Sequence, residues 1–104
     1  MNITQDGINI TNRFFQAIAI LRSEKKLRGL KTFTDKHNLN RWNMVTLRDD
    51  PSSRYLQPEW IAWLCTDYHI SPDWILYGTG SFYRNNVPPK TNTKNKPRQQ
   101  KLNL

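Results

Sequence analysis

Apolar side chains recur at helical spacing near the start of the chain. These positions are Phe14, Phe15, Ile18, Leu21 and Leu27. Residues three and four apart share one face of an α-helix, so the pattern predicts an amphipathic helix that buries this face. Thr11 or Asn12 has a side chain suited to capping its start, and Gly29 is typical of a helix end. We therefore expect the first helix to run from about residue 12 to residue 28.

Two shorter helices, over residues 30–37 and 41–48, are predicted next, with a tight turn between them. Asn38 lies in this turn and is one of the few residue types that tolerate a left-handed backbone. Asn40 has a side chain that can cap the second of these helices. The expected inward residues are Leu30, Phe33, Thr34, Leu39, Met44, Val45 and Leu47.

Two further helices each begin with a proline. After a polar loop at residues 49–53, Pro58 suits the first turn of a helix over residues 58–68. Ser71 is expected to cap a last short helix, with Pro72 at its first position, and Gly78 and Gly80 are expected to end it. The predicted core residues of these two helices are Trp60, Ile61, Leu64, Cys65, Tyr68, Trp74, Ile75 and Leu76.

The two ends of the chain differ from this helical middle. Residues 1–10 hold Asp6-Gly7 between short alternating stretches, which is typical of a small hairpin or of a loose arm, and we favour the arm. Residues 84–104 hold three prolines, five asparagines and few apolar residues, a composition that predicts disorder. The folded domain is expected over residues 11–83.

The charge is strongly positive and unevenly distributed. The 104 residues carry 16 Lys and Arg against 8 Asp and Glu, a net charge of +8. Residues 22–54 have nine bases and four acids, residues 55–83 have three acids and no Lys or Arg, and residues 84–104 have six bases and no acid. Scattered surface charges can produce such a pattern. The alternative is a face that binds a polyanion, with a basic tail that adds affinity.

The composition also sets aside several classes of protein. A single cysteine, Cys65, allows no internal disulfide and cannot supply the thiolates of a zinc site, and His37 and His69 each lack a nearby Cys or His partner. We expect no metal and no cofactor. No carboxylate pair or phosphate-binding loop is present, so we do not expect an enzyme. No segment is apolar enough for a membrane span or a secretory signal, which favours a cytoplasmic, nucleoid-associated protein.

Residues 33–50, FTDKHNLNRWNMVTLRDD, carry the most specific motif. Two short helices that meet at a turn are typical of a helix-turn-helix unit. Together with ISPDWILYGTG at residues 70–80, the block resembles the lambda-repressor-like (XRE-type) helix-turn-helix family, over about residues 11–82. Thr34 and Asn38 depart from the family, where alanine and glycine are commonest. The resemblance implies a compact five-helix, all-α domain that binds double-stranded DNA.

The resemblance also implies which residues would meet DNA. In that family the start of the second helix of the motif enters the major groove and the preceding helix touches phosphate. Residues expected to face bases are Arg41, Trp42 and Thr46, with Asn40 and Asn43 facing a phosphate or a base edge. Residues expected to contact the DNA backbone are Lys31, Thr32, Arg48 and Arg54. It further implies a homodimeric transcriptional regulator, a repressor for instance, of a phage or mobile element.

Other interpretations remain open at this stage. Trp42 is either a core residue or an exposed contact residue, and Trp63 is a candidate homodimer contact because it lies off the apolar stripe of its helix. The protein is alternatively an antitoxin or an excision accessory factor. A protein-interaction module on the same fold, or an RNA-binding protein that uses its basic tail, is a further alternative.

Overall fold

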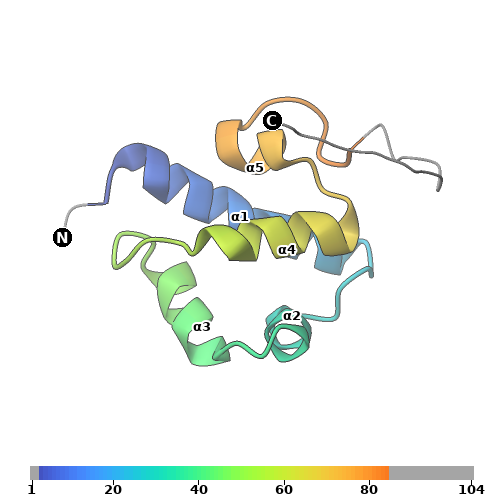
Figure 1. Cartoon of the computed structure of the whole chain (residues 1–104), viewed down its shortest axis with the longest axis horizontal. Helices are drawn as coiled ribbons and strands as arrows, with labels where there is room; N and C mark the ends of the chain where they lie inside the picture. Colours follow the sequence, from blue (N-terminus) through green and yellow to red (C-terminus); the bar gives the residue numbers. More distant parts are fainter. Residues whose placement is uncertain (1–2, 85–104) are drawn as a thin grey trace, which may run out of the picture.

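The computed structural model describes residues 3–84, which form five helices joined by short loops (Figure 1). In Figure 1, α1 and α4 cross the middle of the molecule, with α5 above them and α2 and α3 below. Within residues 3–84, strand-like pairing is limited to one antiparallel bridge between Ile70 and Tyr83. The predicted all-α class is confirmed. Of the tail predicted over residues 84–104, Arg84 is held by its N–H, which donates to His69 O at 2.9 Å, and residues 85–104 lie outside the described residues. The helices are α1 (Gln5–Ser23), α2 (Leu30–Lys36), α3 (Arg41–Asp49), α4 (Pro58–Tyr68) and α5 (Pro72–Tyr77).

The first helix begins well before the position that the sequence pattern predicts. The Thr4 hydroxyl caps α1 by accepting a hydrogen bond from the Gly7 N–H at 3.1 Å. Thr11 is buried and Ile10 packs against the core, so the first turns of α1 belong to the fold. A glycine inside a helix costs about 1 kcal/mol relative to alanine, and the cap and this burial offset that cost. The expectations of an N-terminal arm or hairpin, and of a cap at Thr11 or Asn12, are therefore wrong.

The end of α1 also differs from the prediction. The N–H of Lys26 donates to Leu21 O at 2.9 Å and the N–H of Lys25 donates to Arg22 O at 3.0 Å. This is the Schellman pattern, in which the first residue beyond the helix cap takes a left-handed backbone, and Lys25 does so with φ 62°. Gly29 does not end α1 but precedes α2, where its backbone is extended.

The connection between α2 and α3 follows the prediction closely. Asn38 has φ 57°, and the N–H of Leu39 donates to Thr34 O at 2.8 Å, so α2 ends in a second Schellman turn. Thr34 is completely buried and its hydroxyl donates to Lys31 O, which satisfies a polar group that would otherwise lie unpaired in the interior. Asn40 caps α3 as expected.

The last two helices are tied to the rest of the molecule by hydrogen bonds. Pro58 and Pro72 start α4 and α5 as predicted, but the Ser71 side chain makes no capping bond. The Ser71 N–H instead donates to Phe82 O at 2.8 Å, which holds residues 81–84 against the end of α4. From α1, the Arg13 guanidinium donates to the carbonyls of Ile75 and Leu76 at 2.6 and 2.9 Å, so a cation sits at the negative end of α5.

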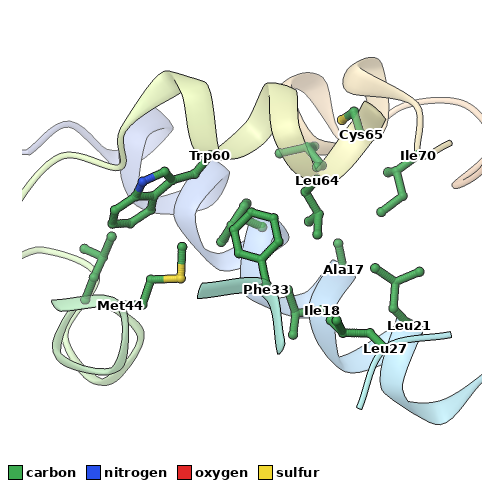
Figure 2. Close-up of a cluster of buried hydrophobic side chains, with 13 residues drawn as sticks. Ala17, Ile18, Leu21, Leu27, Phe33, Met44, Trp60, Leu64, Cys65 and Ile70 are labelled. Atoms are coloured by element: carbon green, nitrogen blue, oxygen red, sulfur yellow. The ribbon is translucent and has the colours of Figure 1, made fainter. Parts of the chain in front are cut away.

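One core joins all five helices (Figure 2). Phe14 of α1 and Phe33 of α2 are both completely buried, with ring centroids 6.1 Å apart, and Met44 from α3 reaches the same core. Cys65 is buried, as predicted for a small apolar residue. Leu76 is 36% exposed, so its predicted place in the core is wrong, because the six-residue α5 buries Ile75 instead. The buried apolar residues are Phe14, Ala17, Ile18, Leu21, Leu27, Phe33, Met44, Leu47, Trp60, Leu64, Cys65, Ile70 and Ile75.

Candidate nucleic-acid interface

The first turn of α3 presents three large polar or amphipathic side chains to solvent. Met44 and Leu47 bury the inward face of this helix, which leaves Arg41, Trp42 and Asn43 exposed. Trp42 is 71% exposed, so it is not a core residue. A tryptophan in this position presents a wide apolar surface to whatever contacts α3.

Two polar side chains of α3 are partly engaged within the helix itself. The side-chain oxygen of Asn40, Oδ1, accepts a hydrogen bond from the Trp42 N–H at 2.8 Å, so this residue caps the helix. The Thr46 hydroxyl donates to Trp42 O at 2.7 Å. The Asn40 NH₂ group and the Thr46 methyl group take no part in these bonds, so both retain capacity for an external contact.

Basic side chains from three helices line one open hollow of about 340 Å³. Arg41 and Arg48 come from α3, Lys31 comes from the start of α2, and Arg22 comes from the last turn of α1. The remaining lining residues are Phe15, Ile18, Ala19, Gly29 and Leu30, so the cationic groups surround an apolar floor. Like charges gathered in this way repel one another, and a bound anion would relieve that repulsion.

The acidic neighbours of this hollow neutralise it only weakly. Lys31 Nζ lies 2.6 Å from Asp35 Oδ2 and Arg48 Nε lies 3.5 Å from Asp49 Oδ1, all four side chains being at least half exposed. Exposed ion pairs of this kind contribute about 0–1 kcal/mol and exchange readily for other partners. The hollow therefore keeps an excess of positively charged groups, which favours anions.

The structure thus brings together three of the basic residues that the sequence analysis proposed and adds Arg22. Thr32 and Arg54 are exposed but do not line the hollow. Arg22 is the first base of the basic segment at residues 22–54, and that charge pattern is the signal that could have identified it.

A cluster of rings and charges links the end of α2 to α4. His37 Nε2 lies 2.8 Å from Asp67 Oδ2, and because an ionised carboxylate only accepts, His37 is the donor. The His37 ring stacks on Trp63 with centroids 4.5 Å apart and planes 2° from parallel. Trp63 therefore has a partner inside the fold, and its role as a dimer contact stays a prediction.

Asp67 carries the negative charge of this cluster. Burial alone would raise the pKa of its carboxyl, but hydrogen bonds from His37 and Lys36 outweigh burial and lower that pKa. Lys36 Nζ lies 3.1 Å from Asp67 Oδ1, so two groups at the end of α2 converge on one carboxylate of α4. This arrangement orients the helix that precedes the turn to α3.

The Cys65 thiol is buried against the core. Burial raises the pKa of the Cys65 thiol, with the nearby Arg84 acting in the opposite direction, so burial disfavours the reactive thiolate. Residues 3–84 contain no group of three or more potential metal ligands arranged around one point. No helix among them combines the length and the apolar character needed to cross a bilayer.

Comparisons with known proteins add no family to this description. A scan against protein-family models and searches of curated proteins and of solved structures found no match for this chain.

Proposed function

We propose that this protein binds double-stranded DNA sequence-specifically, with α3 in the major groove. The observation that carries the proposal is the hollow in which Arg22, Lys31, Arg41 and Arg48 converge beside the exposed first turn of α3. The DNA backbone is a polyanion with regularly spaced phosphates, and cations placed beside a reading helix fix its register on the duplex.

The side chains of α3 supply the groups that base recognition needs. Arg41 can donate two hydrogen bonds to guanine, and Asn43 can pair with adenine or with a phosphate. The exposed Trp42 ring and the Thr46 methyl group are suited to apolar contact with a thymine methyl group. Asn40 can add a contact through its amide group while it caps the helix.

The arrangement of α2, a left-handed turn at Asn38 and α3 supports a helix-turn-helix unit of the lambda-repressor-like type. On this proposal the protein is a transcriptional regulator that binds a two-fold site as a homodimer, with half-sites about one helical turn apart. Regulation of phage or mobile-element genes is the specific role we propose.

Selection of bound duplexes from a random pool, at physiological salt, tests this function. We expect a recovered motif with two-fold symmetry. Recovery of no motif, combined with retention that does not depend on salt, would contradict the proposal.

A matched pair of variants locates the phosphate contacts. Arg22→Ala removes a base that lines the hollow, whereas Lys25→Ala removes an exposed base nearby that does not line it. The slope of log affinity against log salt should fall by about 0.9 for Arg22→Ala, the value for one lost phosphate contact, and should stay unchanged for Lys25→Ala. Equal slopes for both variants would mean that the hollow does not contact DNA phosphates.

A protein-interaction module is the second candidate, and the exposed Trp42 side chain favours it. An aromatic residue that is exposed on a helix is typical of protein interfaces as well as DNA interfaces. In that case Trp42→Ala would abolish partner binding, and binding would be insensitive to salt.

A further inference from the structure

A largely apolar surface, polar only at one end, lies on the other side of the molecule from the basic hollow. Three adjoining hollows of about 390, 220 and 290 Å³ follow one another along it. Leu76 lines all three, Ile10 is shared by the first two, and Ile61 is shared by the last two. The surface is thus formed by the first half of α1, by α4 and by α5, and we refer to it as the α1–α4–α5 surface. In Figure 1, α5 lies on the opposite side of α1 and α4 from α2 and α3.

Exposed large hydrophobic side chains concentrate on this surface. Among residues 3–84, four such side chains are exposed, and three of them, Tyr55, Leu76 and Tyr77, line it. Their exposed fractions are 52%, 36% and 72%. Contiguous exposed apolar patches on small domains mark places where another protein binds.

The low charge of this surface favours contact with a second copy of the chain. Of the residues that line its hollows, only Asp6 and Arg13 carry charge, one of each sign. Arg13 already donates to the end of α5, so the surface is close to neutral. The whole chain carries +8, and the hollow beside α3 is basic. Two copies that approached through their basic sides would repel each other, whereas two α1–α4–α5 surfaces meet without that penalty.

We infer that the α1–α4–α5 surface is the interface for a second copy of this chain. The contact is isologous, with Leu76 near the two-fold axis, because Leu76 is the residue common to all three hollows. Tyr55 and Leu56 follow α3 in the chain, so the interface adjoins the end of α3 and leaves Arg41, Trp42 and Asn43 of both copies exposed. The inference rests on the proposed function only for this last point, since the dimer itself needs no DNA.

Sedimentation equilibrium of the full chain without DNA, over a concentration series, tests the interface. Leu76→Glu and Tyr77→Glu each place a charge in the centre of the surface and should raise the dimer dissociation constant by about 30-fold, the effect of a central interface residue. Trp42→Ala is the matched control, since it removes the exposed large hydrophobic side chain that lies on α3, and it should leave that constant unchanged. Circular dichroism confirms that each variant is folded.

Two results would overturn the inference. One is a wild-type chain that stays monomeric across the series, which would leave the surface to a different protein. The other is a dimer that Trp42→Ala dissociates and that both glutamate variants leave intact, which would locate the interface on α3. A dimer with the expected response but without DNA binding would contradict the proposed function and support the interface.

Discussion

Two surfaces of this small domain differ in chemistry although one core supports both. The hollow beside α3 gathers four cations from three helices around a mainly apolar floor. The α1–α4–α5 surface is mainly apolar in its second and third hollows, and its lining holds one carboxylate and one cation, Asp6 and Arg13. Basic groups favour a polyanion, whereas a near-neutral apolar patch favours a protein surface. The net charge of +8 therefore does not describe the surface evenly. It reflects the basic hollow beside α3, whereas the α1–α4–α5 surface is close to neutral.

The same core residues support the helices of both surfaces. Phe33 holds α2, and with it the turn to α3, against Phe14 of α1. Trp60 of α4 packs near the same Phe14 ring, with centroids 6.5 Å apart. A change in this cluster therefore affects both surfaces, whereas a change on one surface should leave the other intact.

The largest effect is expected from Phe33→Ala, which breaks both surfaces at once. Phe33 is completely buried, so its truncation should lower the free energy of unfolding by about 3–5 kcal/mol. Chemical denaturation followed by circular dichroism measures this loss. Phe33→Leu, which retains much of the volume, should lose less. A loss below 1 kcal/mol for the alanine variant would mean that α2 is not anchored by this residue.

Arg41→Ala should affect only the hollow beside α3, which Arg41 lines. If Arg41 forms two hydrogen bonds with guanine, the variant loses about 1–3 kcal/mol of binding free energy and loses selectivity at one base pair. Titration of duplexes that differ at single positions measures this selectivity. Arg28→Ala is the control, since Arg28 is exposed but does not line the hollow. An equal loss of affinity for every duplex would mean that Arg41 contacts a phosphate and not a base.

The sequence predicts those features that depend on local chemistry. Asn38 takes the left-handed conformation because the turn after α2 requires it, and Pro58 and Pro72 start helices because their missing N–H groups are not needed there. The spacing of Phe14, Ile18 and Leu21 correctly identifies the buried face of α1.

The sequence fails where distant residues decide the outcome. Asp6-Gly7 is typical of a turn, but Thr4 and the burial of Thr11 hold it inside α1. Leu76 lies on a helix of six residues, too short for periodicity to define a buried face. Arg22 joins the candidate site only because the end of α1 approaches α3 in the fold, and neither the motif nor its spacing contains that information.

Variants of Asn40 test whether this residue acts by capping α3 or by contacting DNA. Asn40→Ala removes the cap of α3 and should lower the free energy of unfolding by about 1 kcal/mol. Asn40→Ser retains a capping oxygen and should restore that stability. DNA affinity that recovers together with stability assigns Asn40 a capping role, whereas affinity that stays low in the serine variant assigns it a contact with DNA.

The smallest effect is expected from Asp67, which holds α2 to α4 between the two surfaces. Its pKa is lower in the folded protein than in the unfolded chain, so the folded state holds fewer protons in acid. The stability that this carboxylate contributes is complete above the ordinary aspartate pKa of about 4 and is lost as the pH falls through the lower folded value. Asp67→Asn should therefore cost less than about 1 kcal/mol at neutral pH and should flatten the acid limb of a stability–pH curve.

Asp35→Asn is the matched control, because Asp35 pairs with Lys31 on an exposed helix face. Identical acid limbs for wild type and Asp67→Asn would show that the contacts of Asp67 with His37 and Lys36 do not set the acid stability of the domain.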